Sequence, residues 1–291
     1  MEYKYILYEQ GRVARIKFNR PDYRNALSYV MIEEVCAAFN RADADEEVQV
    51  IVLSGEGRHF STGHDMGSPE ALAEEKERGF EKDDMTKYLS YKEAVDSRLC
   101  LRGLTKPTIA MVHGWCIYEG FMMASTMDII FVSEDAKILP PTNAPYFPLP
   151  YEVGARKAKE ILFENRVMSP FEARDLGFVN RVYPRDKLEQ ETLAFADRIA
   201  DNINVRACKM VINHIQDAMG FTSEVHYAFQ SHYLRTPLAR AIAEAEAAKR
   251  GEEKRRFVAQ ADVSLKYLKL KEEAELTSLP LIREGQPPAS K

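Results

Sequence analysis

Two short segments place ionisable side chains directly beside glycines, at points where apolar runs end. The first is 60–66, which contains Gly63, His64 and Asp65. A glycine lets another group approach the backbone closely, and successive amides at the start of a helix can point at an anion or a polarised carbonyl. Turns of this kind are also common for structural reasons alone. By itself, therefore, the segment only indicates a candidate site for an oxyanion.

The second segment, 113–121, contains Tyr118, Glu119 and Gly120 between an expected strand and an expected hydrophobic helix. A carboxylate at a helix N-terminus is electrostatically favourable, so Glu119 has a purely structural interpretation. Its functional interpretation is a general base or nucleophile in a pocket walled by Tyr118 and Phe121. From the residues alone, both interpretations stay open.

Other residues that could bind or react give weaker signals. His113 stands beside Gly114 and is expected to be structural. The 4 cysteines form no CxxC pair, so we expect reduced thiols and neither a disulfide framework nor a zinc site. They are Cys36, Cys100, Cys116 and Cys208.

The composition argues against several classes of function. The chain has 291 residues, of which 45% are hydrophobic and 29% charged, as in a globular protein with a large core. Lys and Arg number 40 and Asp and Glu 45, giving a net charge of −5, so no nucleic-acid partner is expected. No apolar stretch reaches membrane-spanning length and 1–10 lacks a signal-peptide core, so we expect a cytoplasmic protein without a membrane partner.

The elements that must position these segments follow from hydrophobic periodicity, which predicts an α/β core. We expect a β-hairpin over 3–18, a helix after Ser28, and a buried strand over 48–53. Further expected strands are 107–113 and 129–132, with a helix at 120–127, and helical spacing continues over 155–163, 170–176, 188–202 and 205–219.

Two segments differ from this pattern. Residues 68–96 are strongly charged, so we expect a solvated, mobile insertion there, followed by a helix over 91–102. Residues 239–275 favour helix, whereas 277–291 contains several prolines and should be a flexible tail.

Taken in order, several segments resemble the enoyl-CoA hydratase/isomerase (crotonase) superfamily. They are 19–21 with 25–27, then 60–66, 106–110 running into 113–114, 124–128, and 169–182. Their order and spacing along nearly the whole chain carry the resemblance.

The resemblance implies an α/β crotonase (ClpP/crotonase-like) fold of repeated ββα units with a C-terminal helical trimerisation region. It places the crotonase core with the acyl-CoA site at 1–186, a helical trimerisation or lid region at 187–276 and the tail at 277–291. It also implies a homotrimer or a hexamer built as a dimer of trimers.

The resemblance further implies an acyl-CoA substrate whose thioester oxygen lies between two backbone N–H groups that stabilise an enolate. By position, these are the amides of His64 and Glu119. Coenzyme A enters only as part of the substrate, and no separate cofactor or metal is expected. Expected CoA and substrate contacts are Arg24, Ala26, Asp65, Met66, Gly114, Tyr118, Gly120, Thr142 and Phe147.

Two positions depart from the family's pattern. Hydratases of the family use two glutamates to position and activate water, and here Met122 and Thr142 stand in their places. Neither side chain is a general base at neutral pH. Because His64 and Glu119 remain near the expected thioester site, we expect Glu119, alone or together with the His64 side chain, to supply the acid–base chemistry.

The segment 141–150 is rich in proline and suggests a rebuilt pocket wall. Tyr146, Phe147 and Tyr151 either line an acyl pocket or belong to ordinary core at a trimer contact. The leading expectation is an enoyl-CoA hydratase-type lyase. The alternatives are a C–C bond hydrolase or isomerase acting on a β-oxo or cyclic acyl-CoA, and a non-catalytic acyl-CoA-binding subunit.

Overall fold

The computed structural model describes residues 2–79, 84–142 and 144–234. All elements below belong to the compact unit Met1–Ala239. The helix expected over 239–275 and the tail expected over 277–291 lie outside the described residues, so both stay predictions.

A six-stranded sheet with the order β1-β2-β3-β4-β6-β8 forms the centre of this unit. Strands β1 (Ile6–Glu9) and β2 (Val13–Phe18) pair antiparallel, which confirms the predicted hairpin. The remaining strands run parallel to β2, and parallel neighbours need long crossovers, which the helices supply. They are β3 (Val50–Gly55), β4 (Thr108–Val112), β6 (Ile129–Ser133) and β8 (Arg181–Tyr183), and they confirm the α/β class.

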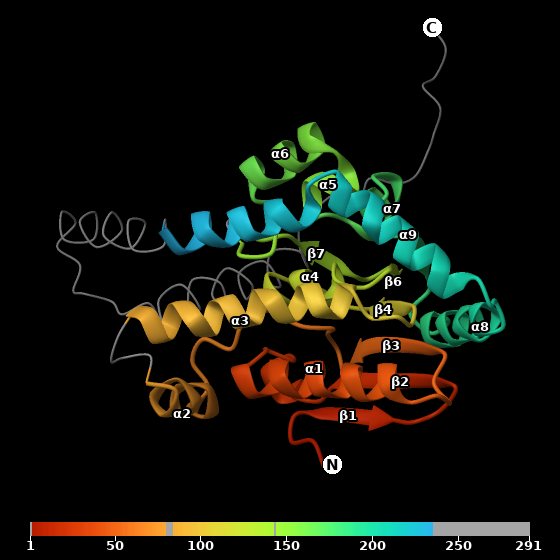
Figure 1. Ribbon diagram of the computed structural model, residues 1–291, viewed down its shortest axis with the longest axis horizontal. Coiled ribbons are helices and arrows are strands. Elements are labelled where there is room, and N and C mark those ends of the chain that lie inside the picture. Colours follow the sequence, from red (N-terminus) through yellow and green to blue (C-terminus); the bar gives the residue numbers. More distant parts are fainter. Residues whose placement is uncertain (1, 80–83, 143, 235–291) are drawn as a thin grey trace, which may run out of the picture. The chain divides into compact units, whose positions relative to one another are not determined.

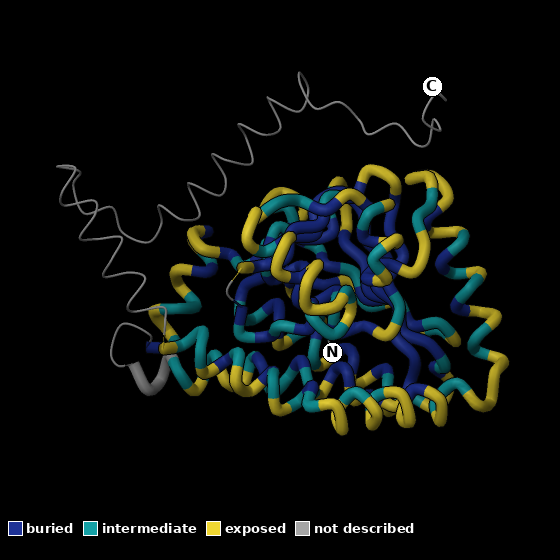
Figure 2. The backbone as a smooth tube through the Cα atoms, turned by 90° about the horizontal axis from the view of Figure 1, so that it is seen from above, coloured by how far each residue is buried: buried dark blue, intermediate teal, exposed yellow. Residues whose placement is uncertain are grey.

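Both faces of the central strands β3, β4 and β6 are covered by helices, which explains their nearly continuous apolar sequences. In β3, Ile51 and Leu53 belong to the core cluster on the side of α1 (Tyr29–Ala44). Val50 and Val52 point the other way, into the cluster that α8 (Leu188–Ala200) completes. Figure 2 shows the buried residues gathered inside the molecule and the exposed ones on outer helical surfaces.

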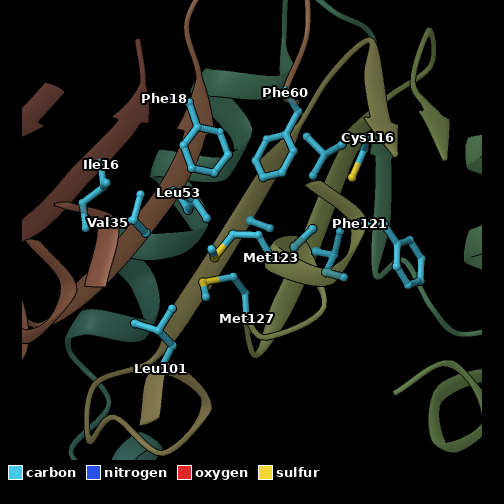
Figure 3. Close-up of a cluster of buried hydrophobic side chains, with 14 of the residues drawn as sticks. Ile16, Phe18, Val35, Leu53, Phe60, Leu101, Cys116, Phe121, Met123 and Met127 are labelled. Carbon is cyan, nitrogen blue, oxygen red and sulfur yellow. The ribbon is translucent and has the colours of Figure 1, made fainter. Parts of the chain in front are cut away.

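The larger core cluster joins the sheet to the helices beside the candidate site. Figure 3 shows Phe18 and Leu53 of the sheet close to Met123 and Met127, at and just after helix α4 (Glu119–Ala124). The ring of Phe18 meets that of Phe60 edge-on, with centroids 5.1 Å apart. These contacts pack segment 60–66 and helix α4 against the sheet.

Most predicted helices coincide with observed ones within a few residues (Figure 1). They are α6 (Ala155–Glu164), α7 (Pro170–Asp175), α8 and α9 (Val205–Ala218), and residues 221–234 are also helical. Several short elements had no signal in the sequence, among them α5 (Leu149–Val153), β8, and the strands β5 (Trp115–Ile117) and β7 (Lys137–Leu139) of a separate parallel pair. Strands of three residues are too short to show alternation.

The prediction for residues 68–96 is wrong in its outline. Helix α2 (Pro69–Glu77) occupies part of it, and α3 (Asp84–Arg102) begins seven residues earlier than the helix predicted from Tyr91. Glu74 of α2 accepts hydrogen bonds from Ser28 Oγ at 3.1 Å and from the amide of Val30 at 3.2 Å. The charges that suggested solvation therefore include a carboxylate that links α2 to the start of α1.

Among the described residues, no helix is both long and apolar enough to cross a lipid bilayer.

Candidate functional site

The two segments singled out in the sequence meet in space. Beyond β3, the amide of Ser61 donates to Trp115 O at 2.9 Å, so this segment runs alongside β5. Gly63 follows with φ +97°, and a Cβ on it would lie 3.0 Å from Tyr118 Cβ and 3.4 Å from the amide nitrogen of Glu119. A side chain at position 63 would therefore press against the turn at 118–119, which explains the glycine.

The backbone N–H groups of His64 and Glu119, the two expected oxyanion donors, both lie at the junction of these segments. The neighbours of His64 bond to Leu27: Leu27 N donates to Gly63 O at 2.8 Å, and Asp65 N donates to Leu27 O at 2.9 Å. Because alternate residues of an extended chain face opposite sides, the amide of His64 points away from Leu27. Glu119 is the first residue of α4, where N–H groups lack an intrahelical acceptor. Within the described part of the chain, no acceptor is recorded for either amide.

Tyr118 and Gly120 shape the turn that presents the Glu119 amide. Tyr118 has φ +50° and ψ −111°, a conformation that costs energy for any residue except glycine. A Cβ on Gly120 would lie 2.8 Å from Ser61 O, so only glycine lets α4 start this close to the segment after β3. The turn is thus tight on both sides of Glu119.

The side chains of the same two residues form a chain of contacts with a third. His64 Nε2 lies 3.0 Å from Glu119 Oε2, and Nη2 of Arg98, from α3, contacts Glu119 Oε1. The Glu119 side chain is fully buried and that of Arg98 is 2% exposed, whereas that of His64 is 36% exposed. A ligand would therefore reach this trio through the imidazole.

The electrostatics of the trio favour a neutral imidazole beside a charged guanidinium. Burial and the nearby Arg98 guanidinium lower the pKa of His64 to about 4, against the opposing effect of the Leu27 carbonyl. Burial also lowers the pKa of Arg98, to about 10, so the guanidinium stays charged at neutral pH. The imidazole nitrogen and the carboxyl oxygen lie 3.0 Å apart, within reach of proton transfer, although neither carboxyl oxygen of Glu119 has a hydrogen-bond partner among the described residues. The His64–Glu119 pair can thus accept or give a proton, while Arg98 balances the carboxylate.

An apolar cluster lies beside the trio. Met122, less than one turn after Glu119, packs in this cluster with Val95 and with Tyr146, which is 1% exposed. Phe147 and Tyr151 are only half-buried at its edge. For Tyr146 the structure favours the core interpretation left open above.

Asp65 is occupied in holding its own loop. Its carboxylate accepts hydrogen bonds from Arg20 Nη1 at 2.7 Å and from Ser68 Oγ at 2.5 Å. Although burial raises the pKa of Asp65, the hydrogen bonds from Ser68 and Arg20 outweigh it and lower that pKa. Met66, which is 40% exposed, is the part of this segment open to a ligand.

Arg24 and Ala26 lie on the loop that borders the same segment, after the short turn η1 (Pro21–Tyr23). Thr62 N donates to Arg24 O at 3.2 Å, which brings this loop beside the segment containing His64. The side-chain amide of Asn25 donates a hydrogen bond to Glu56 O at 2.9 Å, which ties this loop to the residue directly after β3. The structure thus gathers these two expected CoA contacts on the side of His64.

Gly114 and Thr142 are not joined to the trio by any contact recorded among the described residues. A Cβ on Gly114 would lie 2.3 Å from Arg58 O, so packing explains this glycine. Thr142 is exposed, beside position 143, which the structure does not describe. His113 is 7% exposed with Nε2 3.1 Å from Gly57 O, in keeping with a structural residue.

Arg98 is the member of the site that the sequence analysis missed. It lies three residues after Val95 and three before Leu101, both buried, so it occupies the apolar stripe of α3. A charged residue in such a stripe needs a buried partner, and that position is the signal that could have found it.

Comparison with known proteins gives consistent matches. The family model described as enoyl-CoA hydratase/isomerase matches residues 8–262. EchA13 of Mycobacterium tuberculosis, named as an enoyl-CoA hydratase, is 35% identical over 260 residues, which cover 80% of this chain and 81% of that protein.

Solved structures agree in fold. One from Mycobacterium thermoresistibile, described as an enoyl-CoA hydratase, superposes with a TM-score of 0.70 at 36% identity and covers 82% of this chain and 99% of its own. An enoyl-CoA hydratase/isomerase from Xanthobacter autotrophicus Py2 gives a TM-score of 0.74 at 30% identity, covering 86% and 94%.

Proposed function

Because the chain belongs to the enoyl-CoA hydratase/isomerase family and has the crotonase fold, we propose that it binds an acyl-CoA thioester and stabilises its enolate between the amides of His64 and Glu119. Support comes from the close approach of Gly63 to the Glu119 amide and from the lack of a recorded acceptor for either N–H among the described residues. Preorganised donors of this kind are worth roughly 3–4 kcal/mol each in a transition state.

The observation that carries the proposed chemistry is the 3.0 Å contact between His64 Nε2 and Glu119 Oε2. In the proposed reaction, hydration of an enoyl-CoA, the pair takes a proton from water as the water oxygen bonds to the β carbon. The electrons of the double bond move into the enolate, and the α carbon then takes back one proton. One acid–base pair is enough for both transfers because the proton removed is the proton returned.

Isomerisation is the second candidate, and the buried Met122 supports it. The side chain is 3% exposed and stands where family hydratases have a water-activating glutamate. Moving a double bond needs one base that removes and returns a proton, and no water. The His64–Glu119 pair could perform that step unaided.

A panel of enoyl-CoA thioesters analysed by mass spectrometry distinguishes these reactions. A gain of one water supports hydration, whereas an unchanged mass that takes up deuterium in heavy water supports isomerisation. Binding of acyl-CoA without turnover of any panel member would instead indicate a non-catalytic binding subunit and overturn the enzymatic proposal.

The pair itself is tested by His64→Ala and Glu119→Gln. Each should lower kcat by about 10²- to 10⁴-fold, the usual contribution of a positioned acid–base group. His226→Gln is the matched control, because that histidine is half exposed and 3.8 Å from Asp96, away from this trio. Turnover unchanged in both site variants would contradict the assignment.

We also propose a homotrimer or a dimer of trimers working in the cytoplasm. Five apolar side chains of α9 and its cap are more than half exposed in the single chain, which suits a buried interface. They are Met210, Val211, Ile212, Ile215 and Met219. Light scattering should give the mass of three or six chains.

The proposed compartment is supported by the four cysteines, which are free thiols, as in a reducing compartment. Cell fractionation tests this proposal.

A further inference from the structure

We propose that Arg98 is a positioning residue for this reaction, which keeps the Glu119 carboxylate charged and aimed at His64. The inference rests on the proposed function, since it concerns the same acid–base pair. Arg98 contacts Oε1 of Glu119 and His64 contacts Oε2, so Arg98 acts on the imidazole side of the pair through Glu119.

Burial makes Glu119 dependent on a cation. Its side chain has no exposed surface, and an isolated carboxylate in such a place would take up a proton or destabilise the fold. Arg98 supplies the opposite charge through Nη2, while its Nη1 contacts the carbonyl of Ala94 in its own helix. Within the described residues, Nε of Arg98 and both carboxyl oxygens of Glu119 have no hydrogen-bond partner, so the recorded link between the two side chains is their ion pair. Glu119 is therefore the acidic partner recorded for this guanidinium.

The other charges around His64 do not replace Arg98. Asp65 and Glu75 also act on the imidazole, but both are acidic and favour its protonated form. Asp65 is in addition paired with Arg20 at 2.7 Å. Arg98 is the cation that opposes protonation of His64.

The three members of the trio come from three different elements. Arg98 extends from α3, Glu119 opens α4, and His64 follows β3. The planar, forked guanidinium can restrain a carboxylate's orientation, which a lysine ammonium, as a point charge, does less well. The position of α3 is thus coupled to the direction in which Glu119 faces His64.

The direct test is an NMR titration of His64, which needs no substrate. The comparison uses Glu119→Gln and Arg98→Met/Glu119→Gln, because position 119 then cannot change its charge, and removing the cation should move the pKa of His64 up toward its ordinary value. Arg102→Met/Glu119→Gln is the matched control: Arg102 lies one turn further along α3 and is also buried, but it pairs with Asp217 at 3.1 Å. A His64 titration that is the same in Glu119→Gln and Arg98→Met/Glu119→Gln would overturn the inference.

Kinetics separate a positioning role from a structural one. Arg98→Met should lower kcat by about 10- to 100-fold, below the full loss expected for the pair itself, with little change in KM. The pH profile of kcat should shift with the His64 titration, and Arg98→Lys should recover part of the rate. Loss of folded protein with an unshifted pH profile in the remaining enzyme would show a structural role only.

A double variant keeps the test decisive if Arg98→Met folds poorly. Arg98→Met/Glu119→Gln leaves no unpaired buried charge, so it should melt at a higher temperature than Arg98→Met alone. An equal or lower melting temperature would contradict the pairing. If the wild type turns over no acyl-CoA, the proposed function fails, while the His64 titration still tests the role of Arg98. If the wild type is active and Arg98→Met has the same rate and pH profile, only the inference about Arg98 fails.

Discussion

Glu119 takes part in the site through its backbone and its side chain at once. Its amide faces the segment of Gly63, while its carboxylate is buried between His64 and Arg98. A negative charge close to a developing oxyanion would normally oppose catalysis, because like charges repel. The contact with Arg98 balances that charge, so the same residue can offer an N–H donor and take part in proton transfer.

Tyr118 stores backbone strain directly before that donor. Its φ of +50° is unfavourable for a residue with a Cβ, and such positions cost roughly 1–3 kcal/mol. We therefore expect Tyr118→Gly to be more stable than Tyr118→Ala by about 1 kcal/mol, measured by urea unfolding. Both variants lose the ring, so their difference isolates the backbone. Equal stabilities would show that the turn holds no strain.

At the scale of elements, helix α2 anchors the loop that carries His64. Ser68 caps α2 by accepting from the amide of Ala71 at 3.1 Å, and its Oγ also donates to Asp65 Oδ2. Arg20 Nη2 donates to the same Ser68 Oγ at 3.1 Å. The residues directly after His64 are thus tied to the start of a helix and to the loop at 20–26.

Two serine caps allow this anchoring to be measured. Ser169 caps α7 by accepting from Glu172 N at 3.1 Å and, like Ser68, is followed by proline. Ser169→Ala should cost about 1 kcal/mol, the usual value of an N-cap. Ser68→Ala should cost more, about 2 kcal/mol, because it also removes a hydrogen bond from the buried Asp65. Equal losses in urea unfolding would show that Ser68 acts only as a cap.

Elements with strong local signals were predictable, and those made by tertiary contact were not. Strands β3, β4 and β6 appear as apolar runs because both their faces are buried, and α7 begins at a Ser-Pro cap. Residues 69–77 look like solvated chain because α2 buries only Ala71 and is joined to α1 through Glu74. Such a link between distant segments leaves no periodicity.

In the candidate site, too, features with a local sequence signal were predictable and features made by tertiary contact were not. Residues 63–64 and 118–120 were predictable because close backbone approach demands particular residues at a turn. The partner of Glu119 was not, because Arg98 reaches it from a helix 21 positions earlier, a separation set by packing alone. The sequence predicted that His64 and Glu119 lie together, but not that Arg98 contacts Glu119.

On the scale of the whole molecule, the order of the sheet brings the two segments together. Strands β3 and β4 are parallel neighbours, with Ile51 opposite Thr108, and both chemical segments follow their carboxyl ends. Ligand sites of open α/β sheets lie at that edge. Residues 64 and 119, far apart in sequence, therefore meet as a direct consequence of strand order.

The same edge makes the fold sensitive to acid through His113, which follows β4. Burial, and next the nearby Arg185, lower the pKa of His113 to about 4, from 6.5. Because the folded pKa is below the unfolded one, the unfolded state binds more protons between these values. Stability is therefore present above pH 6.5 and is lost as the pH falls toward 4, by about 3 kcal/mol for this one buried group.

Urea unfolding of the wild type and His113→Gln between pH 7 and pH 4 measures this contribution. We expect the free energy of unfolding of the wild type to fall more steeply, so that the two curves, once matched at pH 7, separate as the pH falls toward 4. His64 titrates over the same range in both proteins and cancels in the comparison, and His226→Gln, half exposed, should follow the wild type. Parallel curves for wild type and His113→Gln would mean that the carboxyl edge of the sheet tolerates a charged His113, and that acid sensitivity arises elsewhere in the fold.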